Sequence, residues 1–353
     1  MSAAQQKAEA ADSPERSESR SGTEQAEPKQ THIDRELKHE RPLISCRFDP
    51  TGRFVFAGGE DNRIWRWDLA DGTKTELAGH QSWVRAMAFH PDGQTLISGA
   101  YEGRLIWWPV ADERPTPQRT VEAHKGWVRA LAVSPDGSLV ASAGNDNLVR
   151  LWRAEDGVPV RELAGHKCHV YNVAFHPGGN DLVSCDLKGN LLHWDVASGE
   201  QRRNMAAPVL HKYDKTFWAD IGGARGMTFN RDGSLLAVSG ITNVSNAFAG
   251  VGNPLVLLWD WAKGEKPQEQ RFTKNIRGVA WGVELHPDGF SIAASGGGGG
   301  GYLLFWKLDQ KDQFHELKLP DTARDMDMHP DSIRLATAHY DGHVRICQMA
   351  AKT

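Results

Sequence analysis

A repeat of about 41 to 44 residues organises this chain from residue 40 to its end. Its first marker is a Pro-Asp-Gly-like turn, which occurs seven times, at residues 50–52, 91–93, 135–137, 177–179, 231–233, 287–289 and 330–332. Proline fixes one φ angle and the following residues tolerate positive φ, so such a turn reverses two strands tightly. Seven copies of one unit predict a repeat architecture.

Two further markers keep a constant distance from the turn. A tryptophan stands 17 residues after the turn proline in the first four repeats, and Cys347 has this place in the seventh. A histidine stands 11 residues before the proline in the first four repeats. The segments between the markers, such as 84–89, 95–98 and 104–108, are short, apolar and β-compatible. Four short strands per period are the spacing of a propeller blade.

The motifs Gly-His, Pro-Asp-Gly, Trp-Asp and the segment from Ser142 to Asp146 together resemble the WD-repeat (WD40) family over roughly residues 31–353. This resemblance implies an all-β fold, a seven-bladed β-propeller of four-stranded blades similar to G-protein β propellers. It also implies a non-catalytic scaffold for protein–protein interaction.

In this family a blade's His, Ser or Thr, Asp and Trp form a hydrogen-bonded tetrad, so the matching residues here are expected to be structural. The third repeat has all four, as His124, Ser142, Asp146 and Trp152. The other matches are His80, Ser98 and Trp108 with Glu102 in the Asp position; His39, Asp61 and Trp67 with Ala57 in the Ser position; and His166, Ser184 and Trp194 with Lys188 in the Asp position. Repeats five to seven lack the histidine, and we expect their blades to be less tightly braced.

The beginning of the chain divides into two parts. Residues 1–30 contain no aromatic residue and no Val, Ile or Leu, so they are predicted to be a disordered polar tail. Residues 35–39, Arg-Glu-Leu-Lys-His, resemble residues 161–166, the expected outer strand and Gly-His corner of another repeat. Residues 31–38 are therefore predicted to supply the outer strand of the last blade and to close the ring, because an open sheet edge invites aggregation.

Three departures from the period are expected to lie together on the top face, the face of the Gly-His corners, over blades five and six. They are extra residues near 205–221, an insertion at 241–254 and the six glycines 296–301. The first contains Tyr213, Phe217 and Trp218, residue types suited to partner contacts. The glycine run lacks a phosphate-loop pattern and is interpreted as a hairpin loop.

Five innermost strands begin with an arginine in the alignment: Arg85, Arg129, Arg225, Arg277 and Arg324, with Ile44 and Tyr171 at this position in the other two repeats. The match in the sixth repeat assumes two extra residues before its turn. Trp83, Trp127 and His169 stand two positions earlier. We expect a ring of positive charge at the top mouth of the channel that, with these aromatic residues and Trp218, binds an acidic peptide or protein surface. The alternative is that each arginine pairs with an acidic residue of a neighbouring blade.

Motifs for catalysis are missing: the sequence has no GxSxG, HExxH, SxxK or CxxC. The segment Gly165–His169 was considered as a metal site, and Asp325 with Asp327 as a cation site or acid–base pair, but neither has further partners in the sequence. The chain is therefore predicted to be no enzyme and to hold no metal or cofactor. Two alternatives stay open: a phosphate-bearing ligand or nucleic acid at the arginine ring, and an enzyme with its active site at the channel mouth.

Composition limits the setting. Lys+Arg 41 against Asp+Glu 45 gives a net charge of −4, which argues against general binding of nucleic acid. The chain has no run of 18 apolar residues and no signal-peptide core, and its four cysteines are too few for a disulfide scaffold. We expect a cytoplasmic, monomeric propeller that works within a larger complex and has no membrane contact.

Overall fold

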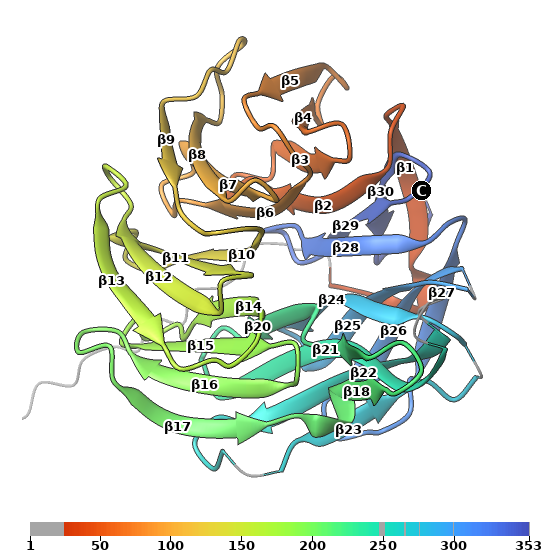
Figure 1. Ribbon diagram of the computed structural model, residues 1–353. Coiled ribbons are helices and arrows are strands. Elements are labelled where there is room, and N and C mark those ends of the chain that lie inside the picture. Colours follow the sequence, from red (N-terminus) through yellow and green to blue (C-terminus); the bar gives the residue numbers. More distant parts are fainter. Residues whose placement is uncertain (1–24, 247–250, 265, 275, 299, 353) are drawn as a thin grey trace, which may run out of the picture.

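The computed structural model describes residues 25–246, 251–264, 266–274, 276–298 and 300–352. Seven four-stranded antiparallel sheets stand in a ring, and a two-stranded hairpin is added to it (Figure 1). The predicted all-β, seven-bladed propeller is confirmed. Residues 1–24 of the predicted tail lie outside the described residues, and Pro28–Gln30 form the short 3-10 helix η1.

The blades follow the seven repeats, each from its innermost to its outermost strand. Blade 1 contains β2 (Leu43–Phe48), β3 (Phe54–Gly59), β4 (Arg63–Asp68) and β5 (Lys74–Ala78); blade 2 contains β6 (Val84–Phe89), β7 (Thr95–Ala100), β8 (Arg104–Pro109) and β9 (Arg119–Glu122); blade 3 contains β10 (Val128–Val133), β11 (Leu139–Gly144), β12 (Leu148–Arg153) and β13 (Pro159–Ala164). Blade 4 contains β14 (Val170–Phe175), β15 (Asp181–Asp186), β16 (Asn190–Asp195) and β17 (Gln201–Ala206); blade 5 contains β20 (Gly226–Phe229), β21 (Leu235–Asn246), β22 (Val251–Asp260) and β23 (Gln268–Arg271); blade 6 contains β24 (Val279–His286), β25 (Phe290–Gly296), β26 (Gly301–Lys307) and β27 (His315–Leu319). Blade 7 contains β28 (Ala323–Met328), β29 (Arg334–His339), β30 (His343–Gln348) and β1 (His32–Lys38), and between blades 4 and 5 lie η2 (Pro208–Leu210), β18 (His211–Asp214) and β19 (Ala219–Gly222).

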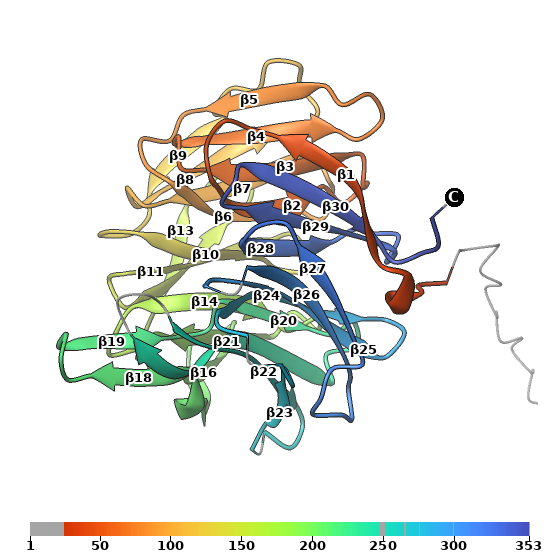
Figure 2. The ribbon, with the colours of Figure 1, turned by 90° about the vertical axis from the view of Figure 1, so that its right-hand side faces the viewer.

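The two ends of the chain meet in blade 7. Strand β1 pairs antiparallel with β30, from His32 opposite Gln348 to Lys38 opposite His343. Both ends of the described chain lie on one face of the ring, and the β18–β19 hairpin projects from the opposite face (Figure 2). We call the face with the hairpin the top face.

The apolar core lies between neighbouring blades. One cluster joins Phe56 and Ile64 of blade 1 to Met87 and Ile106 of blade 2, and other clusters join blades 3 and 4 or blades 7 and 1 in the same way. The tryptophans of the repeat marker fill these spaces, and Trp108, Trp259 and Trp306 are among the largest fully buried side chains. Because each blade is buried on both faces, the ring has one continuous core.

The seven predicted turns share one backbone geometry. Their third residue has a φ between 62° and 82° in every repeat, and it is a glycine in all of them except the seventh, where it is Ser332. This left-handed conformation favours glycine, which explains the third residue of the marker.

Four histidines that directly precede these turns each connect their own blade to the next one, in blades 2, 4, 6 and 7. His90 Nε2 lies 3.0 Å from the carbonyl oxygen of Gly137, and His176 Nε2 lies 3.1 Å from that of Gly233. His286 Nε2 lies 2.6 Å from the carbonyl oxygen of Ser332, and His329 Nε2 lies 2.9 Å from that of Gly52. A carbonyl oxygen only accepts, so Nε2 carries the proton in each case. Sequence reasoning missed this set, although the periodic His-Pro pair was visible in it.

Candidate binding site at the channel mouth

A bulge near the start of the innermost strands places one residue of each blade at the channel mouth. In six blades the pairing with the next strand shifts by one residue, at Ile44, Arg85, Arg129, Tyr171, Trp281 and Arg324. In blade 5, Arg225 directly precedes β20 and donates its backbone N–H to Ser239. A bulge leaves one residue unpaired and redirects its side chain. These seven residues are named the mouth ring below.

The register corrects the prediction for blade 6. Trp281, not Arg277, lies at the bulge, between Ala280 opposite Ser295 and Gly282 opposite Ala294. Counting back from the turn, this blade has no extra residues: His286 follows Ala280 by six positions, as His90 follows Val84 in blade 2. The shared dipeptide Arg-Gly in blades 5 and 6 led to the wrong alignment. Arg277 lies exposed before β24 and outside the ring.

Two arginines of the mouth ring already bind residues of neighbouring blades. A guanidinium nitrogen of Arg324 lies 2.5 Å from the Glu60 carboxylate of blade 1. Arg85 donates to the backbone carbonyl oxygens of Ile44 and Arg324, and it lies 3.8 Å from the Asp325 carboxylate. For these two residues the alternative interpretation, pairing within the ring, is the better description.

Arg129 and Arg225 have no carboxylate partner among the described residues. Their guanidinium carbons lie 4.4 Å and 4.6 Å from the centroid of the Tyr171 ring. Arg129 also donates to the Asn145 side chain at 2.7 Å, whereas the buried Nε of Arg225 has no hydrogen-bond partner. Burial lowers the pKa of both side chains, and no acidic residue offsets this effect.

An aromatic row adjoins Arg129 on the top face. The Trp83 and Tyr101 ring centroids lie 6.0 Å apart, and the Tyr101 and Trp127 rings stack at 3.9 Å. Trp83 and Trp127 stay about 40% exposed, and the Arg129 guanidinium lies 4.3 Å from the Trp127 centroid. The row is thus an accessible aromatic surface beside an arginine without a carboxylate partner. His169, by contrast, bonds to the Asn145 carbonyl oxygen at 2.6 Å and connects blades 3 and 4.

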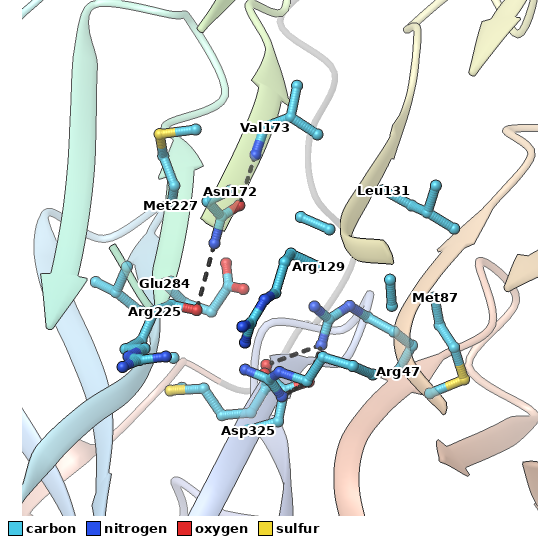
Figure 3. A pocket seen from close by; sticks show the side chains of 17 residues that line it. Arg47, Met87, Arg129, Leu131, Asn172, Val173, Arg225, Met227, Glu284 and Asp325 are labelled. Carbon is cyan, nitrogen blue, oxygen red and sulfur yellow. Dashed lines mark hydrogen bonds and ion pairs between the residues drawn. The ribbon is translucent and has the colours of Figure 1, made fainter. Parts of the chain in front are cut away.

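A cavity of about 100 Å³ lies within the mouth ring. Its charged lining residues are Arg47, Arg85, Arg129, Arg225, Glu284 and Asp325. Figure 3 shows the Arg129 side chain pointing into it, Arg225 at its edge, and a dashed contact between Arg47 and Asp325.

Two acidic residues of the channel, Asp325 and Asp327, form hydrogen bonds with blade 1. Asp325 accepts from Arg47 at 2.8 Å and from the backbone N–H of Cys46, and Asp327 accepts from the N–H of Phe48 at 2.8 Å. Burial raises the pKa of Asp327 to about 6 and, together with the Asp327 charge, that of Glu284 to about 8. The aspartate pair therefore joins blade 7 to blade 1.

The β18–β19 hairpin carries three exposed aromatic side chains, Tyr213, Phe217 and Trp218, exposed by 47%, 53% and 83%. Trp218 has a φ of 53°, a conformation that favours Gly or Asn. The base of the hairpin adjoins the mouth ring, because a Cβ added to Gly223 would lie 3.2 Å from the Tyr171 ring.

The other two departures from the period lie next to this hairpin. Strands β18 and β19 contact β21, which is lengthened by the second insertion. Gly252 accepts a hydrogen bond from the N–H of Gly278, and a Cβ on Gly297 of the glycine run would meet Gly278 at 2.8 Å. The three irregular segments are therefore neighbours over blades 5 and 6, apart from residues 247–250 and Gly299, which lie outside the described residues.

Hydrogen bonds join the tetrad residues in blades 2, 3 and 4. In blade 3 the His124 ring lies 2.8 Å from Asp146 and 2.7 Å from Ser142 Oγ, which accepts from Trp152 Nε1 at 2.9 Å. The same distances to the serine are 2.7 Å for His80 and Ser98 and 2.7 Å for His166 and Ser184, with Trp108 and Trp194 as the tryptophan donors. His80 is also 2.6 Å from Glu102.

Two tetrad positions differ from the sequence alignment. In blade 1, His39 bonds to Asp61 at 3.0 Å, but the indole donor to Asp61 is Trp65 and not Trp67. Ala57 has no hydroxyl, so the Trp67 indole cannot donate at the serine position as Trp108, Trp152 and Trp194 do in their blades. In blade 4, Asp186 pairs with His166 at 3.1 Å. Lys188, which the alignment placed there, lies 3.3 Å from Asp220 of the hairpin.

Comparisons with known proteins agree with this geometry. The family described as "WD domain, G-beta repeat" matches residues 32–68, 72–109, 115–153 and 157–195. This is a WD-repeat propeller. Blades 5 and 6 and the strands β28–β30 of blade 7, which belong to the repeats without the tetrad histidine, lie outside the matched segments.

Curated relatives of this WD-repeat propeller have varied names. Transcription initiation factor TFIID subunit 5 of Caenorhabditis elegans is 38% identical over 27% of this chain and 13% of its own length. WD repeat-containing protein VIP3 of Arabidopsis thaliana is 31% identical over 49% of this chain and 50% of its own length. Nuclear distribution protein nudF of Aspergillus niger is 24% identical over 44% and 30%. The chain thus spans half or less of each relative, and a protein-interaction scaffold fits them all.

Other site predictions for the WD-repeat propeller can be placed as well. The described residues contain no group of three or more His, Cys, Asp and Glu side chains that could hold a metal ion. None of the described helices is long and apolar enough to cross a membrane. The cytoplasmic location stays a prediction. Sequence reasoning missed Tyr101 and Trp281: Tyr101 stands in a turn between two strands, and the bulge that places Trp281 in the mouth ring leaves no mark in the sequence.

Proposed function

We propose that this WD-repeat propeller is a non-catalytic scaffold that binds a protein partner with an acidic segment on its top face. The observation that carries this proposal is the pair Arg129 and Arg225, two arginines without carboxylate partners at the channel mouth. Guanidinium groups bind carboxylates in a bidentate manner, and the loss of water around them strengthens the interaction.

Two aromatic surfaces extend this site and support a protein partner over a small ligand. The Trp83–Tyr101–Trp127 row lies on one side of the mouth, and the β18–β19 hairpin, which carries Trp218, lies against blade 5 (Figure 1). Exposed tryptophan and tyrosine beside arginine are the residue types that dominate binding energy at interfaces. Because the relative in Caenorhabditis elegans is named a subunit, we also propose that this chain works within a complex.

Affinity capture with the full chain as bait tests the proposal. Three baits are compared with wild type: Arg129→Gln and Trp218→Ala on the top face, and Arg231→Gln, an exposed residue in the turn after β20 on the opposite face. We expect a set of proteins that is lost with both top-face variants and kept with Arg231→Gln. Equal capture by all four baits would contradict a top-face site.

A further inference from the structure

We propose that Arg129 and Arg225 together bind one anionic end group of the partner, a carboxylate or a phosphoryl group, inserted into the channel mouth. This inference rests on the proposed function and adds which two arginines recognise the partner, and through what chemistry.

The charge balance of the cavity singles out these two residues. Four arginines and two acidic residues line it. Arg47 is paired with Asp325 at 2.8 Å, and Arg85 is held by two backbone carbonyls and lies near the same aspartate. The other acidic residue is Glu284, whose pKa is raised by burial, and even with both carboxylates charged the four arginines outnumber them. Arg129 and Arg225 therefore leave the cavity with an excess of positive charge.

Both guanidinium groups are held in place before any ligand arrives. Tyr171 lies within 4.6 Å of each of them, and Asn145 fixes Arg129 by a hydrogen bond. Cation–π contacts of this kind fix the plane of the guanidinium and use none of its N–H groups, so N–H groups stay free to donate to a ligand. The Nε of Arg225 is such a donor, buried and unpaired, and an anion would supply the missing acceptor.

The size of the cavity restricts what can enter. A volume of about 100 Å³ accommodates the end of one side chain and a few water molecules. The planar, forked guanidinium suits both carboxylate and phosphoryl oxygens. An acidic or phosphorylated side chain of a peptide thus fits the site in size and in charge.

Titration with inorganic phosphate at constant ionic strength, followed by calorimetry, tests the site directly. We expect the full chain to bind phosphate with a Kd in the millimolar range. Arg129→Gln and Arg225→Gln should each weaken this binding at least tenfold, because each removes a charged donor. Arg324→Gln is the matched control: it removes an arginine of the same ring that Glu60 already neutralises, and it should change the Kd less than twofold.

Unchanged phosphate binding in Arg129→Gln and Arg225→Gln, or no binding by wild type up to about 10 mM, would overturn the inference. Arg129→Lys controls for misfolding, because it keeps the positive charge and loses only the planar, forked arrangement of guanidinium N–H donors. It is expected to bind with intermediate affinity and to melt at the wild-type temperature.

Peptides distinguish the two sources of the anion. Three peptides that differ at one central position, Glu, phosphoserine or Ala, are titrated against wild type and Arg129→Gln. Tighter binding of the Glu peptide identifies a carboxylate, and tighter binding of the phosphoserine peptide identifies a phosphoryl group; in either case Arg129→Gln must weaken it. Equal affinity of the Ala peptide would overturn recognition of an anion.

The two proposals can fail separately. If phosphate binding requires Arg129 and Arg225 but no captured protein depends on Arg129 or Trp218, the scaffold proposal fails and the anion site stands. If captured proteins depend on these residues but phosphate and the acidic peptides do not bind, the scaffold stands and the anion site fails.

Discussion

At the scale of single residues, the tetrads illustrate how a buried hydroxyl can hold two side chains. Ser142 is fully buried and serves both the His124 ring and the Trp152 indole. Removal of its hydroxyl leaves a buried acceptor and a buried donor without partners, and each such group costs about 1–3 kcal/mol.

Ser142→Ala is therefore expected to lower the free energy of unfolding by about 2 kcal/mol or more, measured by urea denaturation. Ser138→Ala is the control in the same blade, because Ser138 is exposed and its hydroxyl bonds, among the described residues, only to the nearby Asp136. Its effect should stay within about 0.5 kcal/mol. Equal effects of the two substitutions would show that the buried hydroxyl has no special role.

In blades 1 and 4 the sequence alignment differed from the structure at a tetrad position, and both differences have the same physical cause. Motif spacing locates the backbone position, but it does not fix which neighbouring side chain reaches the partner. In blade 4 the carboxylate of Asp186 reaches His166 from two residues before the aligned position. In blade 1, where Ala57 replaces the serine, the tryptophan that bonds to Asp61 is Trp65.

At the scale of elements, periodicity predicted the blades because turns and tryptophans recur at fixed distances along the strands. The bulges were not predictable in this way, since a bulge is a shift between two paired strands and leaves no mark on either one alone. The misplacement of Arg277 follows from that: an Arg-Gly pair is visible in the sequence, and the bulge at Trp281 is not.

Closure of the ring by β1 leads to a second prediction. Strand β1 covers the outer edge of β30, and its Glu36 carboxylate lies 2.7 Å from Arg345, a side chain that is only 3% exposed. A chain that lacks residues 1–38 would leave β30 as an open edge and Arg345 with one carboxylate fewer.

This deletion is expected to lower the melting temperature and to produce soluble aggregates in size-exclusion chromatography. Deletion of residues 1–24 is the control, because it removes only residues of the predicted polar tail, and its melting temperature should equal that of the full chain. A monomeric, equally stable product of the longer deletion would mean that β1 is dispensable for closure.

At the scale of the whole molecule, the channel is where several blades share one electrostatic environment. Glu284 comes from blade 6, Asp325 and Asp327 from blade 7 and Arg47 from blade 1, so three carboxyl groups surround one arginine. Asp325 takes the closest contact with that arginine. Glu284 is then left buried, and its pKa rises from the ordinary 4.5 to about 8.

The sign of the resulting pH dependence follows from linkage. Because the pKa of Glu284 is higher in the folded than in the unfolded chain, its contribution to stability is fully present below pH 4.5 and is lost as the pH rises towards 8. Each pH unit of difference between the folded and unfolded pKa corresponds to about 1.4 kcal/mol.

Glu284→Gln keeps the shape of the side chain and cannot ionise. It should therefore be more stable than wild type by about 1 kcal/mol or more at pH 9, and the difference should be several times smaller at pH 5. Urea denaturation at pH 5, 7 and 9 measures this, with the exposed Glu200→Gln as a control that stays close to wild type throughout. A difference between Glu284→Gln and wild type that is the same at all three pH values would mean that Glu284 ionises alike in the folded and unfolded chain, and that the channel tolerates its charge.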